Sequence, residues 1–353
     1  MGFKKIDPKL TFAEIAFASS MEKNRSLDTL MNMNAVIDWS KIEKLLLKHY
    51  KIGSSSEGAD AYSPLMLFKA LLLQKWFRIP SDPELESQIN DRISFKKFLN
   101  LPFDMPSPDH STFSRFRSRL SKKAMIQINS EVLKQFDKKG LSINEGIAVD
   151  ARLVKSASRP MSNDDIKKHR DKRNSPEGKL DKNGNPLKYH RDLESDWTVK
   201  NDVPHYGLKE HASVDVNNGF VLATMMTPAS HHDSPYLPWC TIYSLHTDQN
   251  LEKVYADKGY FAEPNRDFLT LNKIEDGIMR KDTSTAKLTE YEKERNKKIS
   301  KKRYVVEQYF GLSHLHDKAK RAKFTTIIKN TIDSMFRQFA FNLKRGSNLL
   351  RVT

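Results

Sequence analysis

The stretch "YGLKEHASVDVNNGFVLATMMTPAS" (residues 206–230) predicts a hairpin of two antiparallel strands. Apolar and polar side chains alternate on both sides of "NNG" (217–219), a strong signal for a tight turn. Before this hairpin, "INEGIAVDAR" (143–152) is typical of a strand, which we expect to end at Asp150. These segments together predict a sheet in the second half of the chain.

After the hairpin, predicted helices and strands alternate. We expect helices in "YLPWCTIYSLH" (236–246) and "PNRDFLTLNK" (264–273), strands in "LEKVYAD" (251–257) and "DGIMRK" (276–281), and a basic helical end over residues 285–353. Residues 155–205 are polar, and we expect a long loop there. This order of elements predicts an α/β or α+β domain over residues 140–353, with helices packed on a mixed sheet.

The first part of the chain, residues 1–130, predicts a helical domain that precedes the sheet. Ser63 and Pro64 are typical of an N-cap and a first helical residue. Ser81 and Glu84 have the spacing of a capping box at the start of the next helix. We therefore expect helices to begin at both places.

A further helix is predicted from about residue 109 to 120, with Phe113 and Phe116 facing inward. Three arginines of this helix are expected to face outward or to one side: Arg115, Arg117 and Arg119. Guanidinium groups on an exposed helix suit contacts to phosphates and base edges, which indicates DNA binding. A solvated arginine face on an ordinary helical bundle remains open as the alternative.

The overall charge favours a polyanionic partner. The 353 residues carry a formal net charge of +16, and residues 280–353 alone hold 19 Lys and Arg against 7 Asp and Glu. The single cysteine, Cys240, excludes an internal disulfide and a cysteine-based zinc finger. No apolar run approaches the roughly 20 residues that a membrane helix needs, so we expect a cytoplasmic protein without a membrane partner.

Two aspartates follow predicted strands and are candidates for chemistry. The sequence contains no P-loop, dinucleotide, zinc-protease or serine-hydrolase motif, which leaves carboxylates as the candidate groups. Asp150 and Asp257 each follow an apolar run, and neighbouring strands lie about 4.8 Å apart. Two carboxylates at that spacing repel each other unless a cation lies between them. Mg²⁺ suits such a site, although a lone aspartate at a strand end is more often a turn residue.

A third carboxylate is offered by "RYVVEQYFGLSHLHDKAKR" (303–321), which is typical of a helix. Arg303, Glu307 and His314 are spaced four and seven residues apart and so share one face. Glu307 next to the two aspartates would complete a site for two metal ions, which suits in-line displacement at phosphorus. The alternative is that Arg303 and Glu307 form a surface ion pair.

The sequence resembles bacterial insertion-sequence transposases of the IS-five/IS-four group, the DDE enzymes. The resemblance rests on "SDPELE" (81–86) and "PDHSTFSRFR" (108–117), on "AVDARLVKS" (148–156), on "HYGLKEHASVD" (205–215) with "TPASHHDS" (227–234), and on "YADKGY" (255–260). It implies an RNase H-like catalytic domain with a mixed five-stranded sheet, preceded by an all-helical DNA-binding domain. It also implies that the two aspartate strands are adjacent and parallel.

The resemblance places Asp150, Asp257 and Glu307 on the family's Asp, Asp and Glu, as catalytic residues and metal ligands. It implies two Mg²⁺ ions, with Mn²⁺ as a substitute, and Arg303 as a phosphate contact. Ser300 replaces the family's tyrosine and His314 its lysine on the glutamate helix. His314 would be a weaker positive charge than lysine at neutral pH.

The activity that the resemblance implies is DNA transposition. Water would cut a phosphodiester at the element end, and the freed 3′ hydroxyl would attack target DNA in the same site. The implied partners are double-stranded DNA, as terminal inverted repeats and target, and a second copy of the chain in a nucleoid-associated dimer. A metal-dependent nuclease without strand transfer and a catalytically silent DNA-binding repressor remain the alternatives.

Four more residues flank the expected site in "YGLKEH" and "SHHDS": Lys209, His211, His232 and Asp233. They are candidates for a substrate-facing role, and ordinary hairpin and helix-cap roles stay open as the alternative. Trp197 is a candidate for stacking on a base or for anchoring the hairpin.

Overall fold

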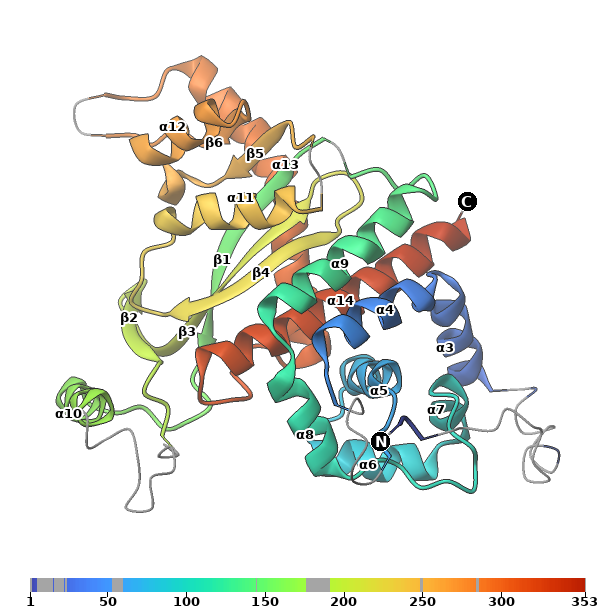
Figure 1. Cartoon of the computed structure of the whole chain (residues 1–353). Helices are drawn as coiled ribbons and strands as arrows, with labels where there is room; N and C mark the ends of the chain where they lie inside the picture. The colour runs from blue at the N-terminus through green and yellow to red at the C-terminus, as the bar shows by residue number, and fades with distance from the viewer. Residues whose placement is uncertain are drawn as a thin grey trace.

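A computed structural model describes residues 2–4, 15, 22, 24–52, 60–143, 145–175, 191–247, 250–283 and 286–352. Seven helices precede the sheet in the described part of the chain (Figure 1). They are α3 (Arg25–Ala35), α4 (Trp39–His49), α5 (Pro64–Trp76), α6 (Asp82–Asp91), α7 (Ile93–Phe98), α8 (His110–Arg119) and α9 (Lys122–Asp137). The predicted helical first part is confirmed.

The sheet has six strands: β1 (Ile147–Lys155), β2 (Asp196–Lys200), β3 (Val203–Asp215), β4 (Val221–Pro228), β5 (Lys253–Ala256) and β6 (Glu275–Ile278). Strand β3 pairs antiparallel with β1, β2 and β4, whereas β1, β5 and β6 run parallel to one another. The order β4-β3-β1-β5-β6 is the mixed five-stranded arrangement expected of an RNase H-like domain. Strand β2 is a sixth strand that the sequence did not predict.

The helices of the second half cover both faces of this sheet. The long helices α13 (Glu290–Asp317) and α14 (Ile327–Val352) lie on one face, where Ala148 and Ala212 pack against Val306 and Tyr309. Helix α11 (Leu237–Leu245) lies on the other face, after the short 3₁₀ turn η2 (Ser234–Tyr236). The turn η3 (Lys258–Tyr260) and α12 (Glu263–Leu271) join β5 to β6.

Helix α14 joins the helical first part to the sheet. Most side chains of helix α5 are buried, and its Phe68 ring lies 5.1 Å from Phe336 and 4.9 Å from Phe339 of α14. On the sheet side, the Asn342 side chain accepts a hydrogen bond from the Val221 backbone N–H. One hydrophobic cluster therefore extends from α3 to α14. The division at residues 130–140 stays a prediction.

The expectation of a loop over residues 155–205 is wrong in part. Helix α10 (Asn163–Asn174) and strand β2 lie within this range, and residues 176–190 fall outside the described residues. Ser162 caps α10 by accepting a hydrogen bond from the Asp165 N–H. The helix buries only Ile166 among its side chains, so its polar sequence carried little helical periodicity.

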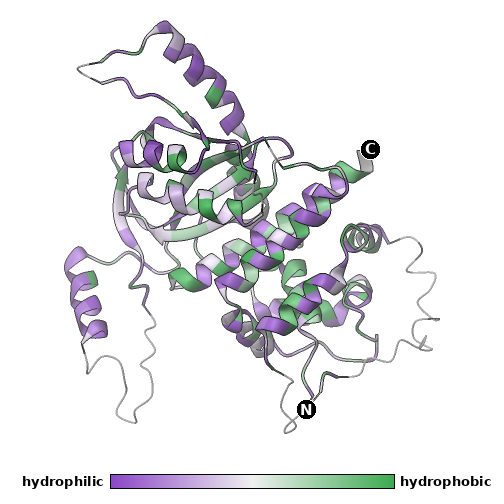
Figure 2. Cartoon of the chain, turned by 45° about the horizontal axis from the view of Figure 1, so that its top comes forward, coloured by the Kyte–Doolittle hydropathy of each residue, from purple (hydrophilic) through white to green (hydrophobic). Residues whose placement is uncertain are grey.

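The remaining local predictions give mixed results. The Ser81 hydroxyl caps α6 as predicted, whereas Ser63 makes no side-chain cap at α5. Figure 2 shows α10 and the first turns of α13 as mostly hydrophilic, in contrast to the sheet. None of the described helices is long and apolar enough to cross a membrane.

Candidate active site

Strand β1 carries Asp150 to the centre of the candidate site. Ile147 and Ala148 pair in parallel with Val254 and Tyr255 of β5. Continued by two residues, this register places Asp150 level with Asp257, on the same face of the sheet. The prediction that the strand ends at Asp150 is wrong, because β1 runs on to Lys155 in pairing with β3.

Asp257 follows β5 directly, as the sequence predicts. Its Oδ1 atom accepts a hydrogen bond of 2.7 Å from the Gly259 N–H and so caps η3. A Cβ atom on Gly259 would lie 2.9 Å from this same oxygen, so a glycine suits the turn. Asp257 is therefore a turn residue by its contacts, and the register places it next to a second carboxylate.

Helix α13 brings Glu307 and Arg303 over Asp150. The Arg303 guanidinium lies 3.0 Å from Asp150 Oδ2 and 4.0 Å from Glu307 Oε1. Arg303 is buried, whereas the Glu307 side chain is 54% exposed. A single cation thus lies between two carboxylates, and Glu307 is open to solvent.

The pKa of Asp150 shows that the three acids share one electrostatic environment. The pKa of Asp150 is raised to about 6, mainly by burial and to a smaller extent by the negative charges of Asp257 and Glu307. Arg303 and the Ala151 N–H, which lies 2.8 Å from Asp150 Oδ1, oppose the rise. A nearby cation stabilises the ionised form of carboxylates that are buried close to other negative charges. Three carboxylates suit Mg²⁺ or Mn²⁺, which prefer oxygen ligands.

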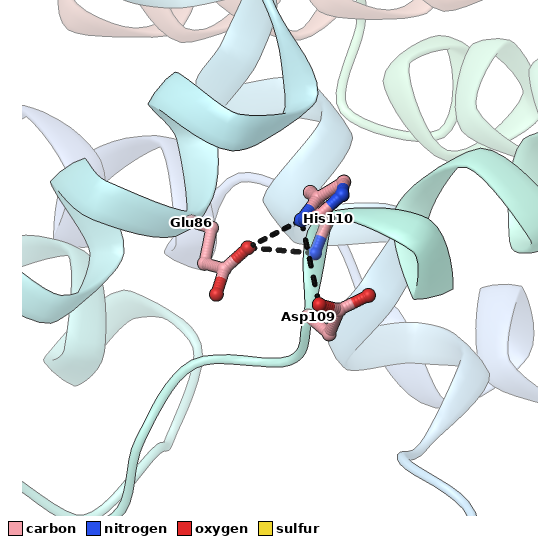
Figure 3. A group of neighbouring side chains, drawn as sticks. All are labelled: Glu86, Asp109 and His110. Atoms are coloured by element: carbon pink, nitrogen blue, oxygen red, sulfur yellow. Dashed lines mark hydrogen bonds and ion pairs between the residues drawn. The ribbon is translucent and has the colours of Figure 1, made fainter.

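Among the described residues, the group whose ligand atoms all lie within 4.8 Å of one another is Glu86, Asp109 and His110, not the three acids above (Figure 3). Its contacts are those of a helix start. Asp109 accepts a hydrogen bond from the Ser111 N–H at the first turn of α8, and Glu86 accepts from the His110 N–H and lies 3.0 Å from its Nδ1. These bonds explain the group without a metal ion.

The three predicted DNA contacts on α8 have different surroundings. Arg115 and Arg119 are exposed, as predicted. Arg117 is buried, and the prediction that it faces outward is wrong. Its guanidinium lies 2.7 Å from Asp82 of α6, so it ties two helices of the first part together.

The residues in "YGLKEH" and "SHHDS" contact one another. Lys209 pairs with Asp233 at 2.9 Å. His211 is fully buried and lies 2.9 Å from the Thr227 hydroxyl, and burial lowers its pKa to about 4. His232 is exposed. The candidate substrate-facing role of His211 does not fit this arrangement, because the side chain is fully buried with its ring 4.5 Å from that of Tyr236 in η2.

Two further candidates are anchored within the fold. Trp197 on β2 donates to the Met161 carbonyl, and its ring lies 5.3 Å from that of Tyr206. His314 is half-buried on α13, and burial together with the charge of Arg152 lowers its pKa. A neutral His314 is a poor partner for phosphate. Ser300 is exposed on the same helix.

Sequence reasoning missed a chain of buried ion pairs beside this site. Glu210 of β3 is fully buried between Arg152 of β1 and Arg337 of α14, with Arg337 at 3.0 Å. Arg337 also pairs with Asp333 at 3.2 Å, and Asp333 pairs with Lys75 of α5 at 2.6 Å. The pairing of β1 with β3 would have revealed this chain of ion pairs, because it sets Arg152 directly opposite Glu210.

Comparison with known proteins gives matches along both halves. The family model described as "Transposase domain (DUF772)" matches residues 19–119, and the model "Transposase DDE domain" matches residues 143–343. A relative is the transposase for insertion sequence element IS1106 of Neisseria meningitidis serogroup B. It is 32% identical over 244 residues, which cover 67% of this chain and 78% of the relative.

Solved structures of the Mos1 transposase are also similar to this chain. The paired-end complex with the left transposon end matches with 12% identity and a TM-score of 0.20, over 76% of this chain and 77% of that chain. The mariner paired-end complex with Mn matches with 11% identity and a TM-score of 0.22, over 96% and 91%. The fold assignment rests on the strand order described above.

Proposed function

This chain belongs to the DDE transposase family, and we propose that it cuts DNA at the terminal inverted repeats of an insertion sequence and joins the ends to target DNA. The family makes it a metal-dependent enzyme that cleaves and transfers DNA strands. One observation of the fold supports the site proposed here. The register of β1 and β5 sets Asp150 level with Asp257, and Arg303 links Asp150 to Glu307.

Asp150, Asp257 and Glu307 would hold two Mg²⁺ ions. Such a pair of ions supplies Lewis-acid stabilisation of the attacking and leaving oxygens of an in-line displacement. Asp257 is held by its cap on η3, and Asp150 by the Ala151 N–H, so both ligands are pre-oriented. Arg303 pairs with Asp150 at 3.0 Å, and its guanidinium would contact a phosphate close to the cut.

The DNA itself would be bound by the basic helices. Arg115 and Arg119 are exposed on α8, so both are available to phosphates of the duplex. Arg117 acts indirectly, by fixing α8 against α6 through Asp82. Two element ends must be held together for joining, so we propose a homodimer on DNA that works at the nucleoid.

The test is a cleavage and strand-transfer assay with Mg²⁺ and the inverted repeats that flank the gene. Asp257→Asn keeps the size of the side chain and removes the charge, and it should abolish cleavage while DNA binding is kept. Asp267→Asn is the matched control, because Asp267 is an exposed aspartate on α12 nearby in sequence. Wild-type cleavage by Asp257→Asn would refute the ligand role.

The same assay separates the other two functions. Cleavage without joining by the wild-type protein would indicate a nuclease. Specific DNA binding with no product, in Mg²⁺ or Mn²⁺, would indicate a repressor.

A further inference from the structure

Two glycines, Gly311 and Gly346, lie inside α-helices of the described part of the chain. Glycine is the least favourable helical residue after proline, so each position calls for a reason. Gly346 of α14 has a packing reason, because a Cβ atom there would lie 2.2 Å from the ring of Phe136. Gly311 of α13 is exposed, and a Cβ atom there would meet no described side chain or neighbouring element within 4 Å. Packing within the described chain therefore does not explain the missing side chain at Gly311.

Gly311 lies next to the three acids, one helical turn after Glu307. Four residues turn a helix by about 400°, so Gly311 is rotated only about 40° from Glu307 and lies about 6 Å further along the axis. Glu307 is 54% exposed, so both residues face solvent on the same side of α13. A stretch of bare helix backbone thus lies beside a carboxylate of the candidate active site.

Tyr304 protrudes from the same side of α13, one turn before Glu307. It is 57% exposed, and it has no hydrogen-bond, ionic or ring partner among the residues that the structure describes. Seven residues separate Tyr304 from Gly311, which places them within about 20° of each other around the helix and about 10 Å apart along it. We refer to Tyr304, Glu307 and Gly311 together as the α13 strip.

One occupant explains both unusual features of the α13 strip. An exposed tyrosine alone is ordinary, and a helical glycine alone is tolerated at a modest cost. A ligand that passes close to a helix needs a position without a side chain, which glycine provides. Every nucleic-acid base has a π-face that stacks on an aromatic ring such as that of Tyr304. A DNA strand meets both requirements next to Glu307.

We propose that a strand of the DNA substrate crosses α13 over Gly311, with a base stacked on the ring of Tyr304, so that the phosphate to be cut lies at Glu307. This assignment rests on the proposed function, and it makes Tyr304 and Gly311 contact residues for the strand. Phosphates of one strand are about 3.4 Å apart along a duplex, so about three nucleotides span the distance from Tyr304 to Gly311.

The first experiment fills the space over Gly311. Gly311→Ala and Gly311→Leu should melt at or above the temperature of the wild type, because both residues favour a helix more than glycine does and the position is open. Cleavage of an inverted-repeat duplex should fall with the size of the side chain, by about 100-fold for leucine, because a reacting group displaced by about 1 Å loses that much rate. Thr270→Leu is the matched control, since it adds the same side chain at an exposed position of α12.

The second experiment removes the ring of Tyr304 and measures binding of the same duplex without divalent metal, so that the DNA stays uncut. Tyr304→Ala should weaken binding by about 5- to 150-fold through the loss of one stacked base. Tyr304→Phe keeps the ring and should bind as the wild type does. Tyr291→Ala is the matched control, because Tyr291 is 77% exposed in the first turn of α13, about 24 Å from Glu307 along the axis.

The proposal would be overturned by wild-type cleavage and binding in Gly311→Leu, or by equal binding in Tyr304→Ala and Tyr291→Ala. A lower melting temperature in both Gly311 variants would also overturn it, because the fold itself would then require the glycine. Loss of self-association in Gly311→Leu with unchanged DNA affinity would assign the α13 strip to a second copy of the chain instead.

Cleavage by the wild-type protein is measured alongside. The expected binding differences without any wild-type cleavage would support the strand contact and count against the proposed function. Wild-type cleavage that none of the variants changes would count against the strand contact alone.

Discussion

Asp150 and Arg152 lie two residues apart on the same face of β1. Negative charge is in excess around Asp150, whereas positive and negative charges are matched around Arg152. Around Asp150, the three carboxylates Asp150, Asp257 and Glu307 face one guanidinium, that of Arg303. Around Arg152, positive and negative side chains alternate through Glu210 and on to Lys75, and Glu210 is fully buried. The Glu307 side chain of the first group is 54% exposed, whereas no side chain of the second group is more than 11% exposed.

The difference indicates two roles on one strand: Arg152 stabilises the packing of the helices on the sheet, and Asp150 belongs to the candidate active site. The paired charges tie β1 and β3 to α14 and α5, which holds the helical first part against the sheet. Burial alone would raise the pKa of Glu210, but Arg152 and Arg337 more than offset this and lower it. At Asp150, Arg303 offsets the burial of the carboxylate only in part, so the pKa of Asp150 stays raised, which is the condition a cation-binding site requires.

The largest expected effect is on stability, from Glu210→Gln. This change leaves Arg152 and Arg337 buried without their shared carboxylate, which should lower the free energy of unfolding by about 3–5 kcal/mol. Chemical denaturation followed by circular dichroism measures it. Glu145→Gln is the matched control, because the Glu145 and Lys302 pair is exposed and should contribute less than about 1 kcal/mol. Equal effects of the two variants would contradict the comparison.

The same substitution at Glu307 should lower activity and leave stability almost unchanged, whereas at Glu210 it should lower stability. Glu307→Gln should lower the cleavage rate by about 100-fold, because a metal ligand contributes several kcal/mol to transition-state stabilisation. The free energy of unfolding should change little, since this side chain is half exposed and its contact to Arg303 is long. Full activity with a loss of stability would show that Glu307 is structural.

The smallest expected effect is on pH dependence. The pKa of Asp150 is raised to about 6, above its ordinary value near 4. Below pH 6 the ionised fraction falls about tenfold per unit, so cleavage at subsaturating Mg²⁺ should fall by the same factor. Saturating Mg²⁺ should shift this decline to lower pH, because the ions favour the ionised carboxylate.

The stability of the metal-free protein tests the same raised pKa of Asp150. Cleavage should rise with pH, whereas the contribution of Asp150 to stability should fall. Between pH 4 and 6 the folded protein binds more protons at Asp150 than the unfolded chain does. This group's contribution to stability therefore decreases as pH rises through that window. The difference in unfolding free energy between the wild type and Asp150→Asn isolates this contribution, and a difference that is independent of pH would contradict the raised pKa.

The sequence predicted most of the sheet because its signals are local. Alternation around "NNG" gave the hairpin of β3 and β4, and the family resemblance gave the parallel pairing of β1 with β5. The sequence pattern also placed Asp257 directly after β5, and Arg303 four residues before Glu307 on one helix. Strand β2 and helix α10 were missed, because short polar segments carry weak periodicity.

The sequence by itself determined the order of the helices and strands outside residues 155–205, and the residues that carry charge. Only the tertiary structure decided which charges are buried, which are paired and which are in excess. Arg115 and Arg117 illustrate this, since they lie on one short helix and only the second meets Asp82. Lys75 and Asp333, 258 residues apart, illustrate it further. Helix periods and caps depend on neighbours a few residues away, whereas the balance of charge at one point depends on every element packed around it.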